Sequence, residues 1–155
     1  MRQDFECVIL IGLPAAGKST LYLDRFATTH VHISKDLWRT AAGREARQRE
    51  ILDKSLAGGF SVVVDNTSPR AAERAALIRI ARLHGARVIG YFFDVTTRAA
   101  VARNAVRSGP AQVPNVAIFT VAKHLEVPSK TEGFDQLFRV EIADDRSLRV
   151  SAIRE

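Results

Sequence analysis

A glycine-rich stretch, GLPAAGKS at residues 12–19, combines residue types and a spacing that suit phosphate binding. It fits the pattern G-x-x-x-x-G-K-[ST] and lies between an expected strand and an expected helix, which is the context that this pattern requires. Backbone N–H groups would wrap around a phosphate chain, with Lys18 at the terminal phosphates and the Ser19 hydroxyl on magnesium. The alternative is a chance match in a Gly-Ala turn, which the flanking elements disfavour. The stretch predicts nucleoside triphosphate binding.

An acid and an arginine follow the second expected strand, in SKDLWR at residues 34–39. Asp36 and Arg39 are three residues apart, so they share one helical face if a helix begins there. The carboxylate would accept the proton of an attacking hydroxyl, and the arginine would grip an anionic group on the same molecule. The structural alternative is an acid in the first turn of a helix that pairs with Arg39. Beside a phosphate loop, the pair favours phosphoryl transfer.

A third polar group ends an apolar strand, in VVVDNTS at residues 62–68. Asp65 would contact a magnesium-bound water or the substrate. Alternatively it would orient Asn66 and Thr67 within a turn, because all three residue types form turns readily. The position at a strand end favours a functional role for Asp65.

Two arginines, Arg103 and Arg107, lie four residues apart on an expected helix that ends at Gly109-Pro110. On one helical face they would close over a triphosphate as a lid and stabilise charge during transfer. An exposed basic helix face is the alternative.

Short β-branched runs alternate with longer stretches of helical spacing along most of the chain. The pattern predicts strands at 7–11, 31–33, 61–64 and 88–93, and helices at 18–27, 37–56, 69–84 and 97–107. The tail predicts a helix over 113–125 and two strands, 138–142 and 148–152, joined by a turn at Asp144-Asp145. This alternation is typical of a parallel sheet covered by helices on both faces, with ligands at the carboxyl ends of the strands.

The composition is that of a globular domain with a basic surface. A length of 155 residues suits a single domain over 1–155, and a net charge of +6 with a pI near 10.1 favours an anionic partner. The single cysteine, Cys7, excludes an internal disulfide and fits a reducing cytoplasm. The N-terminal apolar stretch is too short for a signal peptide or a membrane span. Several arginines are expected on solvated helix faces, among them Arg44, Arg47, Arg74 and Arg82.

Together, these motifs resemble the polynucleotide 5′-hydroxyl kinase family of phage and mammalian enzymes. GLPAAGKST resembles the family's phosphate loop, and SKDLWR resembles its acid-x-x-arginine segment. The family's next strand, turn, helix and strand are similar to the stretch from VVVDNTSPR to VIGYFFDV. RNAVRSG resembles its arginine lid. The VP at 113–114 and EGFD at 132–135 resemble the closing motifs of the mammalian branch. The resemblance implies an α/β P-loop NTPase fold: an open, mostly parallel sheet in an adenylate-kinase-like three-layer sandwich with a helical lid.

The same resemblance implies an ATP- and Mg²⁺-dependent phosphotransferase that acts on the 5′-hydroxyl end of a nucleic acid, with a role in nucleic acid repair. It makes Asp36 the general base, with Lys18 and Arg107 as further catalytic residues and Ser19 as the metal ligand. The nucleotide site implied in this way comprises Gly12, Pro14, Ala15, Ala16, Gly17, Lys18, Ser19, Thr20, Arg103 and Arg107. The substrate site comprises Lys35, Arg39, Asp65, Asn66 and Thr67. Lys35 stands where the family often has arginine, and the region from Thr40 to Phe60 is shorter than in the phage enzyme.

Two other classes of function fit the same residues. One is a P-loop kinase for a small molecule or nucleotide sugar, such as a zeta-toxin-like, antibiotic or sugar kinase. The other is a nucleotide-binding switch module with slow ATPase activity, which would need Lys18 but not Asp36. The identity of the phosphate acceptor separates the first from a polynucleotide kinase, and the dependence of turnover on Asp36 separates the second.

Overall fold

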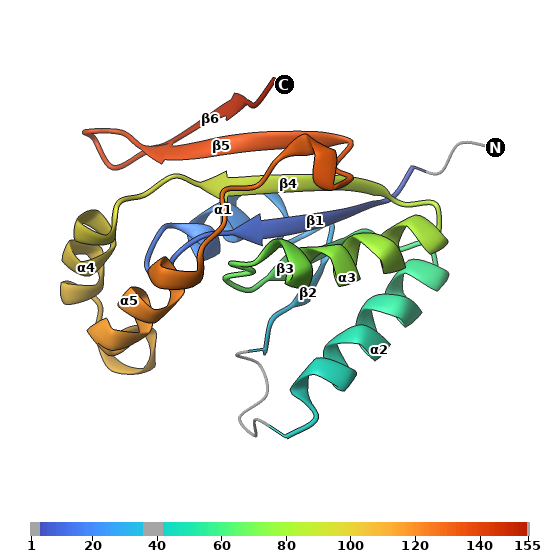
Figure 1. Cartoon of the computed structure of the whole chain (residues 1–155), viewed down its shortest axis with the longest axis horizontal. Coiled ribbons are helices and arrows are strands. Elements are labelled where there is room, and N and C mark those ends of the chain that lie inside the picture. The colour runs from blue at the N-terminus through green and yellow to red at the C-terminus, as the bar shows by residue number, and fades with distance from the viewer. Residues whose placement is uncertain (1–3, 36–41, 155) are drawn as a thin grey trace.

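A six-stranded sheet forms the centre of the protein in a computed structural model that describes residues 4–35 and 42–154 (Figure 1). The strands are β1 (Glu6–Ile11), β2 (Val31–Ile33), β3 (Val62–Asp65), β4 (Arg87–Phe93), β5 (Gln136–Ile142) and β6 (Leu148–Ala152). Their order in the sheet is β2-β3-β1-β4-β5-β6, and only the β5–β6 pair is antiparallel. The carboxyl ends of the five parallel strands therefore meet at one edge, which is the edge where ligands bind in such sheets.

Helices cover both faces of the sheet, as the alternation of elements predicts. On one face α2 (Arg44–Ala57) and α3 (Ala71–Leu83) pack on side chains such as Ile9 and Val64. On the other face α1 (Lys18–Arg25), α4 (Thr97–Ala105) and α5 (Asn115–His124) pack on side chains such as Leu10 and Val63. Because successive residues of a strand point to opposite faces, a strand covered on both sides must be apolar throughout. The run Cys7 to Ile11 meets this condition, and all five residues are fully buried.

Two short 3₁₀ helices, η2 (Gly109–Ala111) and η3 (Lys130–Glu132), complete the connections after α4 and α5. The arrows of β1, β4 and β5 point towards the side of the molecule where α4 and α5 lie (Figure 1). Helices α4 and α5 thus lie at the carboxyl edge of the sheet, where the helical lid is expected. The expected α/β P-loop fold, with an open and mostly parallel sheet between helices, is confirmed.

Several helix boundaries differ from the sequence prediction, and three of them bear on the site. Within the described residues the second helix begins at Arg44, after a left-handed Gly43, and the expected start at residue 37 lies outside them. The third helix begins at Ala71, because Arg70 is extended and Ser68 has a φ of 44°. The fourth helix ends at Ala105, so Arg107 follows the helix instead of lying on it.

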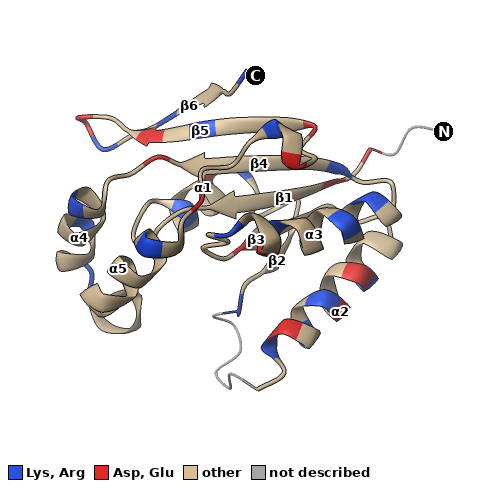
Figure 2. Ribbon diagram, in the orientation of Figure 1, with Lys and Arg blue, Asp and Glu red and all other residues tan. Residues whose placement is uncertain are grey.

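Lysines and arginines are spread over α2, α3, α4 and the β5–β6 hairpin (Figure 2). The expectation that Arg74 lies on a solvated face is wrong, because this side chain has no exposed surface. Among the described residues, no helix has the length and apolar character needed to span a membrane.

Candidate functional site

The phosphate loop connects β1 to α1 and is closely packed against its neighbours. Gly12 donates its N–H to the carbonyl oxygen of Thr67 at 3.0 Å, so the loop is joined to the segment after β3. A Cβ atom at Gly12 would lie 2.9 Å from the Cβ of Phe93, and therefore only glycine fits between β1 and β4. Gly17, with a φ of 102°, takes the left-handed conformation directly before the helix. The backbone geometry thus requires both glycines of the motif, Gly12 because Phe93 lies so close and Gly17 because its φ is positive.

The ammonium group of Lys18 lies inside the loop. Its Nζ donates hydrogen bonds to the carbonyl oxygens of Gly12 at 2.9 Å and Leu13 at 2.6 Å. The hydroxyl-bearing residues Ser19 and Thr20 follow in the first turn of α1, and both are exposed. No acidic residue occupies that first turn, so the positive end of the helix is not neutralised there. This combination is an anion-binding site for a chain of phosphates.

Asp65 ends β3 beside the phosphate loop. In the sheet register it lies opposite Leu10, two residues before the loop begins. Its Oδ2 atom is 2.9 Å from Nε2 of His32 on β2, and the ring of Tyr22 stacks on His32 with centroids 4.0 Å apart. The side chain of Asp65 is therefore held in place, with 10% of its surface exposed.

The ends of β2 and β3 are joined through the side chain of Asn66. Its Oδ1 accepts the N–H of Lys35 at 2.9 Å, and its Nδ2 donates to Oε1 of Gln48 at 2.5 Å. The carbonyl oxygen of Lys35 in turn accepts two hydrogen bonds from Arg44, at 3.1 and 2.7 Å. The amide of Asn66 and the guanidinium of Arg44 thus fix the position from which the acid-x-x-arginine segment starts.

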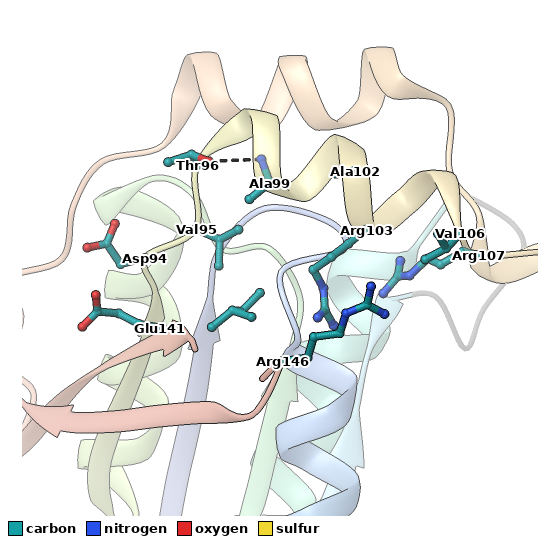
Figure 3. Close-up of a pocket in the computed structure, with 11 residues that line it drawn as sticks. Asp94, Val95, Thr96, Ala99, Ala102, Arg103, Val106, Arg107, Glu141 and Arg146 are labelled. Carbon is teal, nitrogen blue, oxygen red and sulfur yellow. Dashed lines mark hydrogen bonds between the residues drawn. The ribbon is translucent and has the colours of Figure 1, made fainter. Parts of the chain in front are cut away.

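Three arginines converge on a cavity of about 600 Å³, which lies on the side of the phosphate loop away from β3 (Figure 3). Arg103 comes from α4, Arg107 from the segment after it, and Arg146 from the turn between β5 and β6. Nε of Arg103 also donates to the carbonyl oxygen of Ala15 in the phosphate loop at 2.9 Å. Burial lowers the pKa of Arg103, and the nearby charges of Arg107 and Arg146 lower it further. Guanidinium groups this close to one another favour a polyanionic ligand.

Two carboxylates, Asp94 and Glu141, line the same cavity away from the arginines (Figure 3). Asp94 faces Arg139, whose Nε lies 3.4 Å from its Oδ2 atom. The cavity therefore has one cationic end beside the loop and a second end with hydrogen-bond acceptors.

A buried amide holds the segment that carries Arg107. The side chain of Asn104 donates to the carbonyl oxygen of Val113 at 2.6 Å and accepts its N–H at 3.0 Å. Arg107 itself donates to the carbonyl oxygen of Ala111 at 3.1 Å. The bonds close the chain between α4 and α5 into a compact loop at the cavity.

The predicted site residues fall into three groups in the structure. The loop residues Gly12 to Thr20 and the two lid arginines lie together, and the substrate residues Lys35, Asp65, Asn66 and Thr67 lie together at the ends of β2 and β3. Asp36 and Arg39 lie outside the described residues. His32, Gln48 and Arg146 were not predicted, since a lone polar residue on a strand, a helix or a turn carries no motif.

The chain shares its fold with solved structures of kinases. It superposes on a gluconokinase from Sinorhizobium meliloti 1021 with a TM-score of 0.65 and 18% identity, over 93% of this chain and 86% of that one. It superposes on a fungal RNA kinase with a TM-score of 0.69 and 14% identity, over 100% and 80% of the two chains. At these identities the likeness concerns the fold alone.

The chain belongs to the AAA domain family, whose model matches residues 7–128. The bifunctional polynucleotide phosphatase/kinase of Schizosaccharomyces pombe is 27% identical over 139 residues, which are 87% of this chain and 33% of that protein. A relative from Acanthamoeba polyphaga mimivirus is 27% identical over 150 residues, with 92% and 35% coverage. The chain spans about a third of the length of these relatives. The resemblance to the polynucleotide kinase family is confirmed.

Proposed function

We propose that this protein is a kinase that transfers the γ-phosphate of ATP to a 5′-hydroxyl end of DNA or RNA. The observation that carries the proposal is the position of the phosphate loop, with an arginine-lined cavity on one side and the polar ends of β2 and β3 on the other. Such a site offers separate places for a phosphate donor and a phosphate acceptor. The name of the S. pombe relative, a polynucleotide phosphatase/kinase, supports a nucleic acid as the acceptor.

The donor nucleotide would bind along the loop and into the cavity. Its phosphates would lie against the backbone N–H groups of the loop and the start of α1, where Lys18 would exchange its carbonyl partners for phosphate oxygens. The cavity of about 600 Å³ lies within the range of pockets that bury a whole small ligand, so it has room for the base and ribose. Arg103, Arg107 and Arg146 would then neutralise phosphate charge from the lid side.

The residues near the loop fit a magnesium ion. Mg²⁺ prefers oxygen ligands and is usually held by one or two protein groups together with substrate phosphates and water. The exposed hydroxyl of Ser19 and the carboxylate of Asp65, which His32 contacts through one oxygen, provide such a set. When bound, the ion would neutralise charge on the β- and γ-phosphates.

The acceptor would approach from the ends of β2 and β3. Asp36 directly follows Lys35, whose backbone is fixed by Asn66 and Arg44, and it would accept the proton of the attacking hydroxyl. Arg39 would bind the adjacent phosphate of the strand. For Asp36 and Arg39, which lie outside the described residues, the roles rest on their places in the sequence.

Most of the rate enhancement would come from positioning and charge stabilisation. In phosphoryl transfer the protein performs little covalent chemistry, so in-line placement of hydroxyl and γ-phosphate matters most. The bond between Arg103 and Ala15 keeps the lid on the loop, and this contact would exclude water from the transferring group.

The test is transfer of labelled γ-phosphate to a 5′-hydroxyl oligonucleotide, in parallel with a panel of sugars and without any acceptor. We expect transfer to the oligonucleotide, loss of transfer on Asp36→Asn, and loss of both transfer and ATP hydrolysis on Lys18→Ala. Transfer to a sugar but to no DNA or RNA end would contradict the proposal in favour of a small-molecule kinase. Slow hydrolysis that Asp36→Asn leaves unchanged, with no transfer to any acceptor, would indicate a switch module.

A further inference from the structure

A second, smaller pocket lies beside the acceptor side of the site, between α2 and α3. It has a volume of about 170 Å³ and reaches the ends of β2 and β3. Its lining from those strand ends and from α2 and α3 comprises Lys35, Glu45, Gln48, Arg49, Asn66, Ser68, Glu73, Ala76 and Leu77. Lys35 directly precedes Asp36, and Asn66 directly follows Asp65. The pocket therefore lies at the strand ends from which the residues expected at the acceptor follow in the chain.

The walls of this pocket are held by hydrogen bonds within the protein. Asn66 is fixed by Lys35 and Gln48, as described above. The carbonyl oxygen of Ser68 accepts a hydrogen bond at 2.9 Å from the fully buried Arg74, which also pairs with Glu132. A pocket whose walls are fixed in advance does not have to be ordered by its ligand, and this lowers the entropic cost of binding.

Two nearly buried polar groups in the pocket are left for a ligand. Gln48 and Ser68 are each 4% exposed. Within residues 4–35 and 42–154, neither Nε2 of Gln48 nor the hydroxyl of Ser68 has a hydrogen-bond partner. Neither atom is among the buried polar atoms that lack a partner, so both reach accessible surface, where they can bind a molecule that enters the pocket. Leu77 and Ala76 supply an apolar wall next to them.

The charges around the pocket favour a neutral ligand over a phosphate. Lys35 and Arg49 are balanced by Glu45 and Glu73, and Lys35 forms an ion pair with Glu45. A phosphate would meet two carboxylates at the rim, whereas a neutral group with donors and acceptors can use the amide, the hydroxyl and the carboxylates. An apolar wall beside hydrogen-bonding groups suits the face and edge of a nucleobase.

The size of the pocket limits it to one ring system. A cavity of about 150 Å³ accommodates a benzene ring, and pockets for whole drug-sized ligands start near 300 Å³. At about 170 Å³ the pocket holds a single base, with the larger part of a purine reaching its mouth, but not a base pair. The terminal base must therefore be unpaired to enter.

We infer that this pocket binds the unpaired base of the 5′-terminal nucleotide of the acceptor, with Gln48 and Ser68 as its hydrogen-bonding residues. The inference rests on the proposed polynucleotide kinase function and adds a preference for single-stranded or frayed ends. Binding of the terminal base would anchor the nucleotide whose 5′-hydroxyl is phosphorylated.

The experiment compares two single-stranded 5′-hydroxyl acceptors, one with a normal terminal nucleotide and one with an abasic terminal residue. Each is tested with the wild type, Gln48→Met, Ser68→Ala and the control Glu50→Gln, which changes an exposed residue of α2 outside the pocket. We expect the KM of the normal acceptor to rise roughly fivefold in Gln48→Met and in Ser68→Ala, the effect of one hydrogen bond. The abasic acceptor should have a raised KM in the wild type, and Ser68→Ala should not raise it further.

Other outcomes contradict the inference, and they separate it from the proposed function. Equal KM values for the two acceptors in the wild type, or equal effects of Ser68→Ala on both, would show that the pocket does not bind the base while leaving the kinase intact. Absence of transfer to either acceptor would overturn the proposed function and this inference together. The comparison of the two acceptors with the wild type needs no substitution, so it tests the inference even if a variant does not fold.

Discussion

The Nε of Arg103 donates a hydrogen bond to the carbonyl oxygen of Ala15 over 2.9 Å, and this bond joins helix α4 to the phosphate loop. The two residues are 88 positions apart in the chain. Ala15, the loop residue that accepts this bond, has a left-handed backbone conformation with a φ of 63°. The lid helix and the phosphate loop are therefore in direct contact.

Replacing Arg103 with glutamine should lower kcat/KM for ATP by about 10²–10³, because one charged donor to the transferring phosphate is lost. Steady-state kinetics with varied ATP measures this effect. Arg98→Gln is the matched control, since Arg98 is an exposed arginine of the same helix and does not line the cavity. Similar losses in both variants would show that general surface charge, and not the contact of Arg103, is responsible.

Arg146 should contribute to nucleotide binding more than to the chemical step. It lies in the β5–β6 turn with a φ of 69°, a left-handed conformation that asparagine tolerates better than most residues. Arg146→Asn should therefore keep the turn and the melting temperature while the KM for ATP rises about tenfold, as expected when a charge-assisted hydrogen bond is lost. A fall in kcat at unchanged KM would instead place Arg146 at the transition state.

Gly12→Ala should disable the phosphate loop. The added Cβ would lie 2.9 Å from the Cβ of Phe93, a buried side chain that cannot move aside easily. The loop would have to shift, and the bond from the N–H of Gly12 to Thr67 would be lost or lengthened. We expect ATP binding, measured by calorimetry, to fall at least tenfold. Gly59→Ala is a useful control, because an added Cβ there meets no atom within 4 Å and tests only the left-handed backbone.

The elements and the phosphate loop were predictable from local patterns. The run CVILI is typical of a strand buried on both faces, and the motif at 12–19 specifies its own turn through its glycines. Helix ends were less predictable, because they depend on contacts outside the helix. Pro69 marks a good start in the sequence, but Arg74 donates to the carbonyl oxygens of Ser68 and Pro69, and the helix begins only at Ala71.

Residues that act through contacts distant in the sequence could not be found in this way. Arg146 reaches the cavity because β5 and β6 form a hairpin at the edge of the sheet, and nothing in the residues around it indicates this. Gln48 is one of several polar residues on α2, and only packing of the helix beside Asn66 selects it. The burial of Arg74 requires Glu132, which is 58 positions away.

The buried pair of Arg74 and Glu132 should be a major determinant of stability. Arg74 has no exposed surface and forms two bonds to Glu132, at 2.8 and 3.0 Å. Arg74→Met leaves the carboxylate of Glu132 without its cation, so the free energy of unfolding should fall by about 3–5 kcal/mol. The double variant Arg74→Met/Glu132→Gln should recover part of the loss, because no buried charge remains unpaired. Urea unfolding of the four proteins in this cycle measures the coupling, and additive losses would contradict it.

Cys7 should be unreactive in the native protein. Burial, with a smaller effect of the charge on Glu6, raises the pKa of its thiol from 9.0 to about 12. Because the folded-state pKa is raised, the stabilising effect of the neutral thiol is complete below pH 9.0 and is lost as the pH rises towards about 12. The free energy of unfolding of the wild type should therefore fall more steeply over this range than that of Cys7→Ala, by up to about 1.4 kcal/mol per pH unit.

Alkylation at about pH 8.5 gives an independent check, because a thiol reagent attacks the thiolate. The native protein should resist the reagent and the guanidinium-unfolded protein should react at once, whereas rapid labelling of the native protein would mean that β1 opens readily.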